Sequence, residues 1–283
     1  MSAPSSPQPA APIGVFDSGV GGLTVLRALR ERMPSEEFLY LGDTARLPYG
    51  TKSPQTVARY SLQCAQGLIS RGARALVVAC NTASASALPA LRAAFPQLPL
   101  FGVIEPGAAE AVRVSASRHI AVIATQATIA GGAYEHAIRR LAPDARVATR
   151  ACSLFVALAE EGWVDGPIAD AVARRYLDDL FQGDNPPDTL VLGCTHFPQL
   201  LSAIRAAVPA GVNLVDSADT TAQFVARELE LLGAPDRPVA SSSDSRQGGI
   251  HWLATDGAAR FAQVGSRFLG RHLREDQVEI IDL

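Results

Sequence analysis

The sequence predicts an α/β fold with two pseudo-symmetric domains, each a mostly parallel sheet flanked by helices, and an active site in the cleft between them. Short apolar runs alternate with amphipathic helical patterns along most of the chain, which is typical of parallel sheets covered by helices on both faces. The pattern also repeats once. Residues 13–18 resemble residues 120–125, and a strand that ends at a cysteine follows each segment at a similar spacing. The expected domains are 13–103 together with 216–283, and 104–215.

The first domain is expected to begin with a buried strand that ends at Asp17 and Ser18. Three glycines follow within the next four residues, which predicts a tight turn into the first helix. Strands are expected at 13–16, 38–41, 75–79 and 100–103, and helices at 23–32, 54–70 and 86–95.

The second domain is expected to repeat this alternation. Strands are expected at 120–124, 146–151, 190–192 and 213–215, and helices after Pro106, at 128–141, 154–161 and 167–181, from Pro198, and up to Leu232. The closing strands at 250–254 and 278–281, with a helix at 258–270, are expected as edge elements. Residues 1–12 are expected to form a disordered tail and residues 233–249 a loop.

The charges are mixed, with 25 basic and 28 acidic side chains, and neither sign gathers in a block. Neither a nucleic-acid partner nor a membrane partner is therefore expected. Residues 1–12 lack the basic and apolar regions of a signal peptide, and no apolar run approaches the roughly 18 residues of a membrane span. We therefore expect a cytoplasmic protein.

Cysteine and lysine usage narrows the choice of cofactor. Four cysteines without close pairing favour reduced thiols over a disulfide framework, and no metal-ligand spacing occurs, so no metal is expected. Lys52 is the only lysine and lies in a polar turn, so a pyridoxal phosphate Schiff base has no other candidate. Glycine-rich phosphate and dinucleotide loops are also missing. We expect no cofactor.

Two cysteines each end an apolar strand and precede two polar residues. The segments are Ala79-Cys80-Asn81-Thr82 and Gly193-Cys194-Thr195-His196. Ligands of open α/β sheets bind beyond the carboxyl ends of the strands, where Asp17 and Thr125 are also expected. If the two domains face each other there, the thiols approach a ligand from opposite sides. Such a pair can take a proton from one face of a carbon acid and return a proton to the other face.

A thiol suits this chemistry because its reference pKa of about 8.5 lies near neutrality. His196 lies two residues beyond Cys194 and Asp17 ends an adjacent strand, so both a histidine–cysteine and an aspartate–cysteine pair are expected. A cationic histidine would lower the pKa of a thiol, whereas a carboxylate would raise it and could accept its proton. The short polar side chains that could hold a substrate's carboxylate and amino groups are Ser18, Asn81, Thr82 and Thr195.

Each candidate also has a plainer interpretation. A single cysteine at a strand end is more often a small core residue, but two at equivalent places reverse that preference. Asp17 could cap a helix, His196 could be a buried structural histidine, and Tyr49 could be a packed loop residue. Cys64, in a helical pattern, and Cys152, after a strand, are interpreted as packing residues.

Four motifs, taken in order and spacing, resemble those of glutamate racemases. They are Asp17-Ser18-Gly19-x-Gly21-Gly22-Leu23, Gly42-Asp43-x4-Pro48-Tyr49-Gly50, Ala79-Cys80-Asn81-Thr82-Ala83 and Gly193-Cys194-Thr195-His196-Phe197-Pro198. Each motif alone is weak, and the four together are highly specific. The resemblance covers residues 13 to 232 and extends more loosely to about residue 270.

The resemblance implies a cofactor-independent interconversion of L- and D-glutamate that supplies D-glutamate for bacterial peptidoglycan. It implies a small-molecule substrate and a homodimer. It assigns Cys80 to deprotonation of D-glutamate and Cys194 to deprotonation of L-glutamate. Asp17 would assist Cys80, and His196 would assist Cys194 together with a glutamate, for which an ungapped alignment selects Glu160 and leaves Glu161 as the alternative. The positions that match substrate-binding residues are Asp17, Ser18, Pro48, Tyr49, Gly50, Asn81, Thr82, Thr125, Thr195 and His196.

The chain also departs from the family pattern. The family's usual serine or asparagine is replaced around Ala130-Gly131-Gly132, and Ala157 and Ala159 stand where the family has a proline and a valine. The C-terminal part does not resemble the long extension that some members use for regulation, so control by a cell-wall precursor is not expected. The alternatives are an aspartate or hydantoin racemase of the same superfamily, a non-catalytic binder of amino-acid-like ligands, and an interaction protein.

Overall fold

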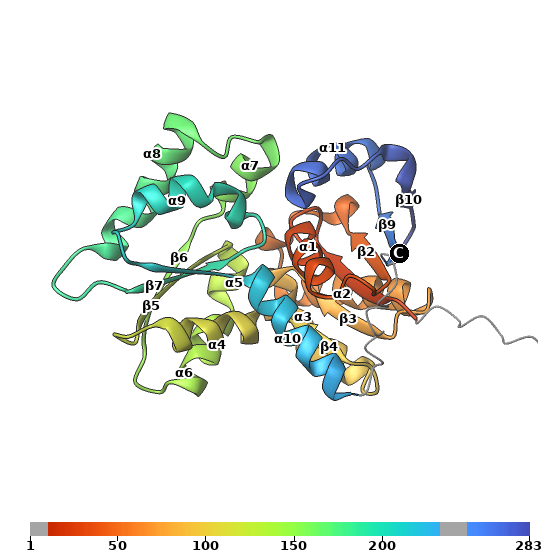
Figure 1. The fold of residues 1–283 in the computed structure, drawn as a ribbon, viewed down its shortest axis with the longest axis horizontal. Helices are drawn as coiled ribbons and strands as arrows, with labels where there is room; N and C mark the ends of the chain where they lie inside the picture. The colour runs from red at the N-terminus through yellow and green to blue at the C-terminus, as the bar shows by residue number, and fades with distance from the viewer. Residues whose placement is uncertain (1–10, 233–247) are drawn as a thin grey trace, which may run out of the picture.

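The computed structural model describes residues 11–232 and 248–283, and it contains two parallel sheets that lie side by side with helices around each (Figure 1). The six-stranded sheet has the order β10-β9-β2-β1-β3-β4, and the four-stranded sheet has the order β6-β5-β7-β8. We call each sheet with its helices the first and the second lobe. The predicted α/β fold class is confirmed. Most of the predicted tail (1–12) and loop (233–249) lies outside the described residues.

The first lobe is built on strands that are buried along their length. All residues of β1, β2 and β3 are buried, as expected for strands covered on both faces. Its strands are β1 (Ile13–Asp17), β2 (Phe38–Gly42), β3 (Ala75–Val78), β4 (Leu100–Gly102), β9 (Ile250–Ala254) and β10 (Val278–Ile280). Its helices are α1 (Leu23–Arg32), α2 (Pro54–Ile69), α3 (Asn81–Ala94) and α11 (Ala258–Leu269), with short 3₁₀ helices η1 (Thr44–Arg46), η2 (Tyr49–Thr51) and η5 (Glu275–Gln277).

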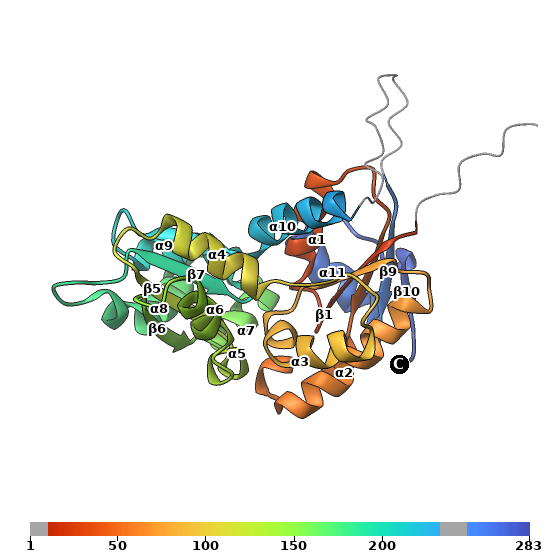
Figure 2. The same cartoon turned by 90° about the horizontal axis from the view of Figure 1, so that it is seen from below.

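The second lobe contains the remaining strands and most of the short helices. Its strands are β5 (His119–Ala124), β6 (Arg146–Ala151), β7 (Thr189–Gly193) and β8 (Asn213–Asp216). Its helices are α4 (Ile104–Val114), α5 (Gln126–Ala130), α6 (Ala133–Leu141), α7 (Leu154–Glu161), α8 (Gly166–Leu177), α9 (Leu201–Ala207), η3 (Asp178–Phe181) and η4 (Phe197–Leu200). The following helix, α10 (Ser217–Leu231), packs on both α1 and α4 and so joins the lobes (Figure 2).

The two sheets repeat one topology, which is the structural form of the sequence repeat. The order β6-β5-β7-β8 in the second lobe matches β2-β1-β3-β4 in the first. Strands β1 and β5 therefore occupy equivalent central places, and so do β3 and β7. Because all the paired strands are parallel, Cys80 after β3 and Cys194 after β7 lie at equivalent carboxyl edges.

Some predicted elements differ from those observed. The helix expected at 86–95 begins at Asn81, because Cys80 already has an extended backbone and serves as its N-cap. The helix expected at 128–141 is divided into α5 and α6, because Gly132 adopts a left-handed conformation with φ +62°. The expected edge position of residues 250–254 is wrong: β9 pairs with β2 on one side and β10 on the other.

Apolar packing continues from one lobe to the other. One buried cluster contains Val15 of β1, Ile123 of β5, Ala108 of α4 and Val225 of α10, so α4 and α10 close the side of the molecule where the chain crosses between the sheets. The domain limits proposed from the sequence stay a prediction. No helix in 11–232 or 248–283 combines the length and apolar character that a membrane span requires.

Candidate active site

Asp17, at the carboxyl end of β1, is a buried carboxylate with one unused oxygen. It is 1% exposed, and its Oδ2 accepts the backbone N–H of Gly19 at 2.9 Å. Its Oδ1 is also buried and has no hydrogen-bond partner among the described residues. Burial raises the pKa of Asp17, whereas the positive charge of His196 and the backbone N–H groups of the turn oppose that rise. The free oxygen is therefore available to a proton donor.

The glycines after Asp17 let the β1–α1 turn approach the second lobe closely. A Cβ built on Gly21 would overlap the Thr195 hydroxyl and lie 2.5 Å from His196 Nδ1. A Cβ on Gly22 would lie 2.6 Å from the Cβ of Asp17. These contacts are closer than real Cβ atoms make, so the turn requires glycine at both places.

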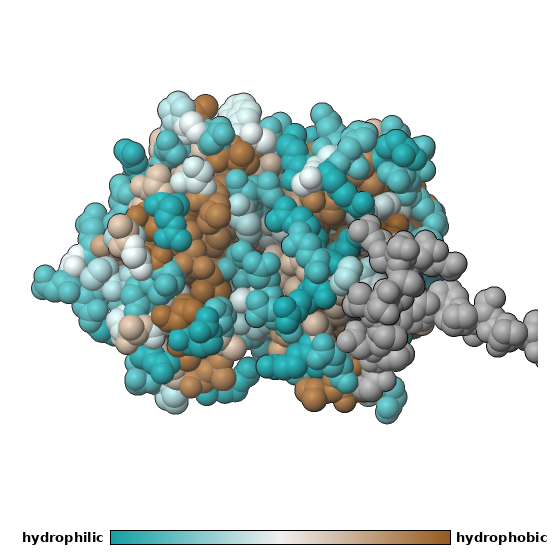
Figure 3. Space-filling model, in the orientation of Figure 1, coloured by the Kyte–Doolittle hydropathy of each residue, from teal (hydrophilic) through white to brown (hydrophobic). Residues whose placement is uncertain are grey.

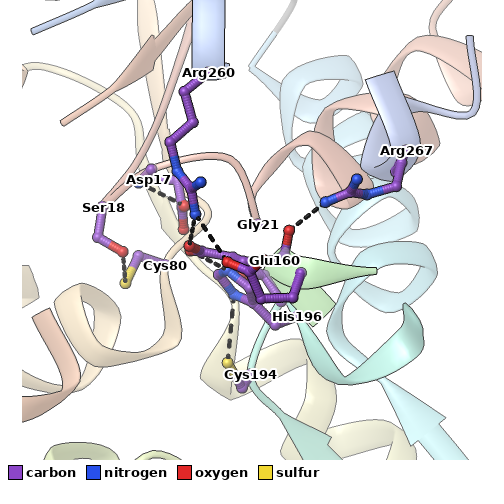
Figure 4. A network of polar contacts seen from close by, with 12 residues as sticks. Asp17, Ser18, Gly21, Cys80, Glu160, Cys194, His196, Arg260 and Arg267 are labelled. Atoms are coloured by element: carbon purple, nitrogen blue, oxygen red, sulfur yellow. Dashed lines mark hydrogen bonds and ion pairs between the residues drawn. The ribbon is translucent and has the colours of Figure 1, made fainter. Parts of the chain in front are cut away.

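Cys80 lies beside Asp17 and Ser18 on the first-lobe side. The side chain is 6% exposed, and its thiol donates a hydrogen bond to Ser18 Oγ at 3.7 Å (Figure 4). Burial raises the pKa of Cys80 to about 12, and the negative charge of Asp17 adds to the rise; a charge on Cys194 acts in the same direction. The neutral thiol is therefore the favoured form of Cys80.

Cys194 lies beside a buried histidine on the second-lobe side. Its Sγ is 3.8 Å from His196 Nδ1, and His196 Nε2 is 3.2 Å from Glu160 Oε1 (Figure 4). Burial alone would lower the pKa of His196, but the hydrogen bonds with Cys194 and Glu160 raise it to about 10. The hydrogen bond from His196 lowers the pKa of Glu160 despite its burial. The pair is therefore an imidazolium and a carboxylate at neutral pH.

The geometry of α7 separates the surroundings of Glu160 from those of Glu161. Glu160 points to His196, whereas the side chain of Glu161 is 61% exposed and forms its ion pair with Arg260. Only one of two successive residues can face inward from the last turn of a helix, because neighbours point about 100° apart. The ungapped alignment therefore selected the residue that contacts His196.

Three threonine hydroxyls meet where the lobes touch. Thr82 Oγ1 lies 2.9 Å from Thr125 Oγ1 and 3.1 Å from Thr128 Oγ1. Thr125 is also the N-cap of α5, accepting the N–H of Thr128. Thr82 and Thr125 had been singled out as substrate-binding candidates, and Thr128 had not. The cluster joins the N-terminus of α3 in the first lobe to the N-terminus of α5 in the second.

The side chain of Asn81 is held between the lobes. Its Oδ1 accepts the hydroxyl of Tyr134 at 2.7 Å, and its Nδ2 donates to Ser217 Oγ at 3.4 Å. Asn81 and Tyr134 are 2% and 3% exposed. Asn81 therefore connects α3 to α6 and α10 in this structure, and its backbone N–H, at the start of α3, is the part that can face a ligand.

A buried carboxylate, that of Asp43, holds the Pro48-Tyr49-Gly50 turn in place. Tyr49 is 1% exposed, and its hydroxyl donates to Asp43 Oδ2. Asp43 also accepts from Arg46 and Thr255. A Cβ on Gly50 would lie 2.9 Å from the Cβ of Thr125. The Tyr49 side chain is thus directed into the core, while the turn brings its backbone to the second lobe.

Thr195 and the two other cysteines are buried. Thr195 is 3% exposed, and its carbonyl oxygen accepts from the Thr24 hydroxyl at 3.4 Å. Cys64 and Cys152 are free and fully buried, and Lys52 lies in the turn before α2. Within the described parts of the chain, no group of three or more His, Cys, Asp or Glu side chains is placed to hold a metal ion.

Sequence reasoning missed the side chains that α11 contributes. Arg260 lies 3.5 Å from Glu160 Oε2, Arg267 donates to the backbone carbonyl of Glu160, and the Phe268 ring packs edge-on against His196 with centroids 5.1 Å apart. A helix of the first lobe therefore contacts the histidine and glutamate of the second. The positions at 260 and 267 share one helix face, but nothing in the sequence signalled that this face meets α7.

Comparison with known proteins identifies the family of this chain. The family model for Asp/Glu/hydantoin racemases matches residues 23–225. A glutamate racemase from Geobacter metallireducens is 52% identical over 264 residues, which cover 92% of this chain and 93% of that protein.

Solved structures agree with both the fold and the family. The crystal structure of a glutamate racemase isoform from Bacillus anthracis has a TM-score of 0.88 at 34% identity and covers 98% of this chain and 99% of its own. A glutamate racemase from Francisella tularensis, crystallised with D-glutamate, has a TM-score of 0.86 at 33% identity, with coverage of 96% and 97%. The chain therefore belongs to the Asp/Glu/hydantoin racemase family and, within it, to the glutamate racemases.

Proposed function

We propose that this protein interconverts L- and D-glutamate without a cofactor by moving protons on and off the α-carbon with Cys80 and Cys194. One observation carries the proposal: two buried thiols lie at equivalent strand ends of the two lobes, with the charge of Asp17 acting on Cys80 and the His196 ring beside Cys194. Two acid/base groups on opposite faces are what an inversion at carbon requires. The Francisella tularensis relative binds D-glutamate, which supports glutamate as the substrate.

The reaction balances with one thiolate and one thiol. The thiolate removes the α-proton, so the C–H bond breaks and its electron pair stays on the α-carbon. The opposing thiol then donates its proton to the other face of the carbanion. The product is the opposite enantiomer, and the two sulfurs have exchanged their protonation states. Proton transfer with solvent, or the reverse reaction, restores the starting state.

We assign a neutral thiol as the resting form of Cys80, because burial and the carboxylate of Asp17 favour it, and we assign the cationic His196 as the partner of Cys194. In this assignment Cys194 takes the proton of L-glutamate and Cys80 takes that of D-glutamate. His196 with Glu160 assists Cys194, and Asp17 assists Cys80.

Substrate binding is assigned to polar groups around the two thiols. The free Oδ1 of Asp17 suits the α-ammonium group, because a buried carboxylate is a strong acceptor for a cation. Backbone N–H groups at the start of α3 suit a carboxylate. The other proposed contacts are the side chains of Ser18, Thr82, Thr125, Thr195 and His196, and the backbones of Pro48, Tyr49, Gly50 and Asn81.

The proposal includes a cellular setting and an assembly. Its product, D-glutamate, would be supplied to peptidoglycan synthesis, and two reduced thiols favour the reducing cytoplasm.

A homodimer is part of the proposal because apolar side chains gather on the surface of the second lobe (Figure 3). The exposed ones on α7, α8, α9 and the turn after α7 are Leu154, Trp163, Ile168 and Leu201. Apolar side chains gathered on one surface typically mark an interface, and light scattering measures the assembly directly.

The experiment that tests the activity follows the α-hydrogen in D₂O. Purified protein is incubated with L- or D-glutamate, with no added cofactor, and the α-deuterium of both enantiomers is measured by NMR. We expect deuterium to enter and the optical rotation to fall to zero from either side. A binding protein would leave the α-carbon unlabelled. Exchange with aspartate or a hydantoin but not with glutamate would favour the alternative racemases.

A further inference from the structure

Helix α11 of the first lobe contacts His196 and Glu160 of the second lobe. Figure 4 shows Arg260 and Arg267 approaching Glu160 from two sides. Arg260 lies 3.5 Å from Glu160 Oε2, while the other carboxylate oxygen, Oε1, faces His196 Nε2. The two oxygens of one carboxylate thus bind two cations from different lobes.

The second contact fixes the backbone of α7. The guanidinium of Arg267 donates to the carbonyl oxygen of Glu160, one of the carbonyls that the end of a helix leaves without an internal partner. The helix ends at Glu161, and its C-cap Gly162 has a left-handed φ of +79°, a backbone conformation that residues with a side chain rarely adopt. Arg267 therefore holds the last turn of α7, and Glu160 lies in that turn.

The third contact reaches the histidine itself. The Phe268 ring is fully buried and packs edge-on against His196. Charged groups that face the pair are Cys194 and Asp17 beside His196, and Arg260, Arg267 and Glu161 beside Glu160. Each of the three contacts from α11 crosses from the first lobe to the second, so all three depend on the lobes being together.

We infer that Arg260 is a positioning residue that orients Glu160 onto His196, so that α11 completes the Cys194 half of the active site from the opposite lobe. This inference rests on the proposed racemase function and deepens it. Glu160 alone could rotate toward solvent, because its carboxylate lies at the end of a flexible side chain. A second cation on Oε2 restricts that rotation and keeps Oε1 on the histidine.

The test compares two arginines of similar exposure. Arg260→Gln removes the cation beside Glu160, and Arg260→Lys keeps a charge there. Arg274→Gln is the matched control, because Arg274 is 60% exposed, as Arg260 is 63% exposed, and its ion pair is with Asp276 in the same turn. kcat and KM are measured for both enantiomers from pH 5 to 10, together with the melting temperature.

We expect Arg260→Gln to lower kcat/KM about two- to fivefold in both directions. The acidic limb of its pH profile should move to higher pH by roughly half a unit, because losing a nearby cation makes Glu160 harder to ionise. Arg260→Lys should restore part of both effects, and Arg274→Gln should match the wild type. The melting temperature of Arg260→Gln should stay within a few degrees, since the side chain is mostly exposed.

Three results are distinguishable. If the wild type racemises glutamate and Arg260→Gln matches it in rate and pH profile, the inference is wrong while the proposed function stands. If Arg260→Gln loses activity only in step with a large fall in melting temperature, without a shift of the acidic limb or rescue by lysine, Arg260 is merely structural and the inference is wrong. A wild type without racemase activity overturns the proposed function and this inference with it.

Discussion

The Nδ1 atom of His196 lies 3.8 Å from the Sγ of Cys194. The Cys80 thiol donates instead to the hydroxyl of Ser18, near the carboxylate of Asp17. The two halves of the site therefore share strand positions but differ in charge. An imidazolium favours a thiolate, and a carboxylate in a buried place favours a thiol. The repeated fold provides two equivalent positions, and the different neighbours place a cation beside one sulfur and a carboxylate near the other.

Replacing His196 with Asn should impair the Cys194 half selectively. The substitution removes the cation beside the sulfur while keeping a polar side chain of smaller volume, so we expect kcat to fall about 10²- to 10⁴-fold, the usual value of a positioned acid/base group. Circular dichroism assays that start from each enantiomer measure kcat. Retention of more than a tenth of the wild-type kcat would show that His196 does not assist Cys194.

The protonation of His196 should also appear in the stability of the fold. Its pKa is raised to about 10 in the folded protein, from an ordinary value of 6.5. A raised pKa stabilises the fold fully below about pH 6.5, and this stabilisation is lost as the pH rises through about 10. We therefore expect the unfolding free energy to fall more steeply over this interval in the wild type than in His196→Gln. Urea titrations at several pH values measure both, and parallel curves would contradict the expectation.

Gly21→Ala tests the close approach of the turn to the second lobe. A methyl group there would overlap the Thr195 hydroxyl and the His196 ring, so one of these side chains has to move. We expect a destabilisation of about 1–3 kcal/mol and a loss of kcat larger than the loss of binding. Gly19→Ala is the control, because its methyl group would lie no nearer than 3.5 Å to Leu47. Equal behaviour of the two variants would rule out this role for Gly21.

Tyr134→Phe tests the polar link between α6 and α3. The substitution deletes the 2.7 Å hydrogen bond to Asn81 and leaves the buried Asn81 carbonyl oxygen without that donor. We expect a loss of about 1–3 kcal/mol in the unfolding free energy, the usual result of leaving a buried polar group unpaired. Urea unfolding measures it. Tyr60→Phe serves as a control on a partly buried tyrosine ring, and an unchanged stability in Tyr134→Phe would contradict the assigned link.

Local sequence patterns predicted much of the fold because strands and helices here have clear periodicity. The limits of α1 agree with the prediction at both ends, since Gly22 and Met33 bound a regular amphipathic stretch. The break at Gly132 was missed because a single left-handed glycine inside a helical pattern gives little signal. The place of β9 was missed because sheet order depends on long-range pairing, which local periodicity does not contain.

Some residues of the candidate site were also predictable from the sequence, and others were not. The positions of Cys80, Cys194 and Asp17 were predictable because residues at strand ends can be located from the strands themselves. Arg260 and Phe268 were not, because their role depends on α11 folding back onto α7 from about a hundred residues away. The side chain of Tyr49 is directed to Asp43, an orientation that a Pro-Tyr-Gly turn alone does not specify.

The most direct test of the two-thiol account is to follow single cysteine variants in D₂O. Cys80→Ala and Cys194→Ala are each given L- and D-glutamate, and racemisation and α-deuterium are measured separately, with circular dichroism as the check on folding. We predict no racemisation by either folded variant, with any residual exchange confined to L-glutamate in Cys80→Ala and to D-glutamate in Cys194→Ala. Racemisation at the wild-type rate by either variant would contradict the account.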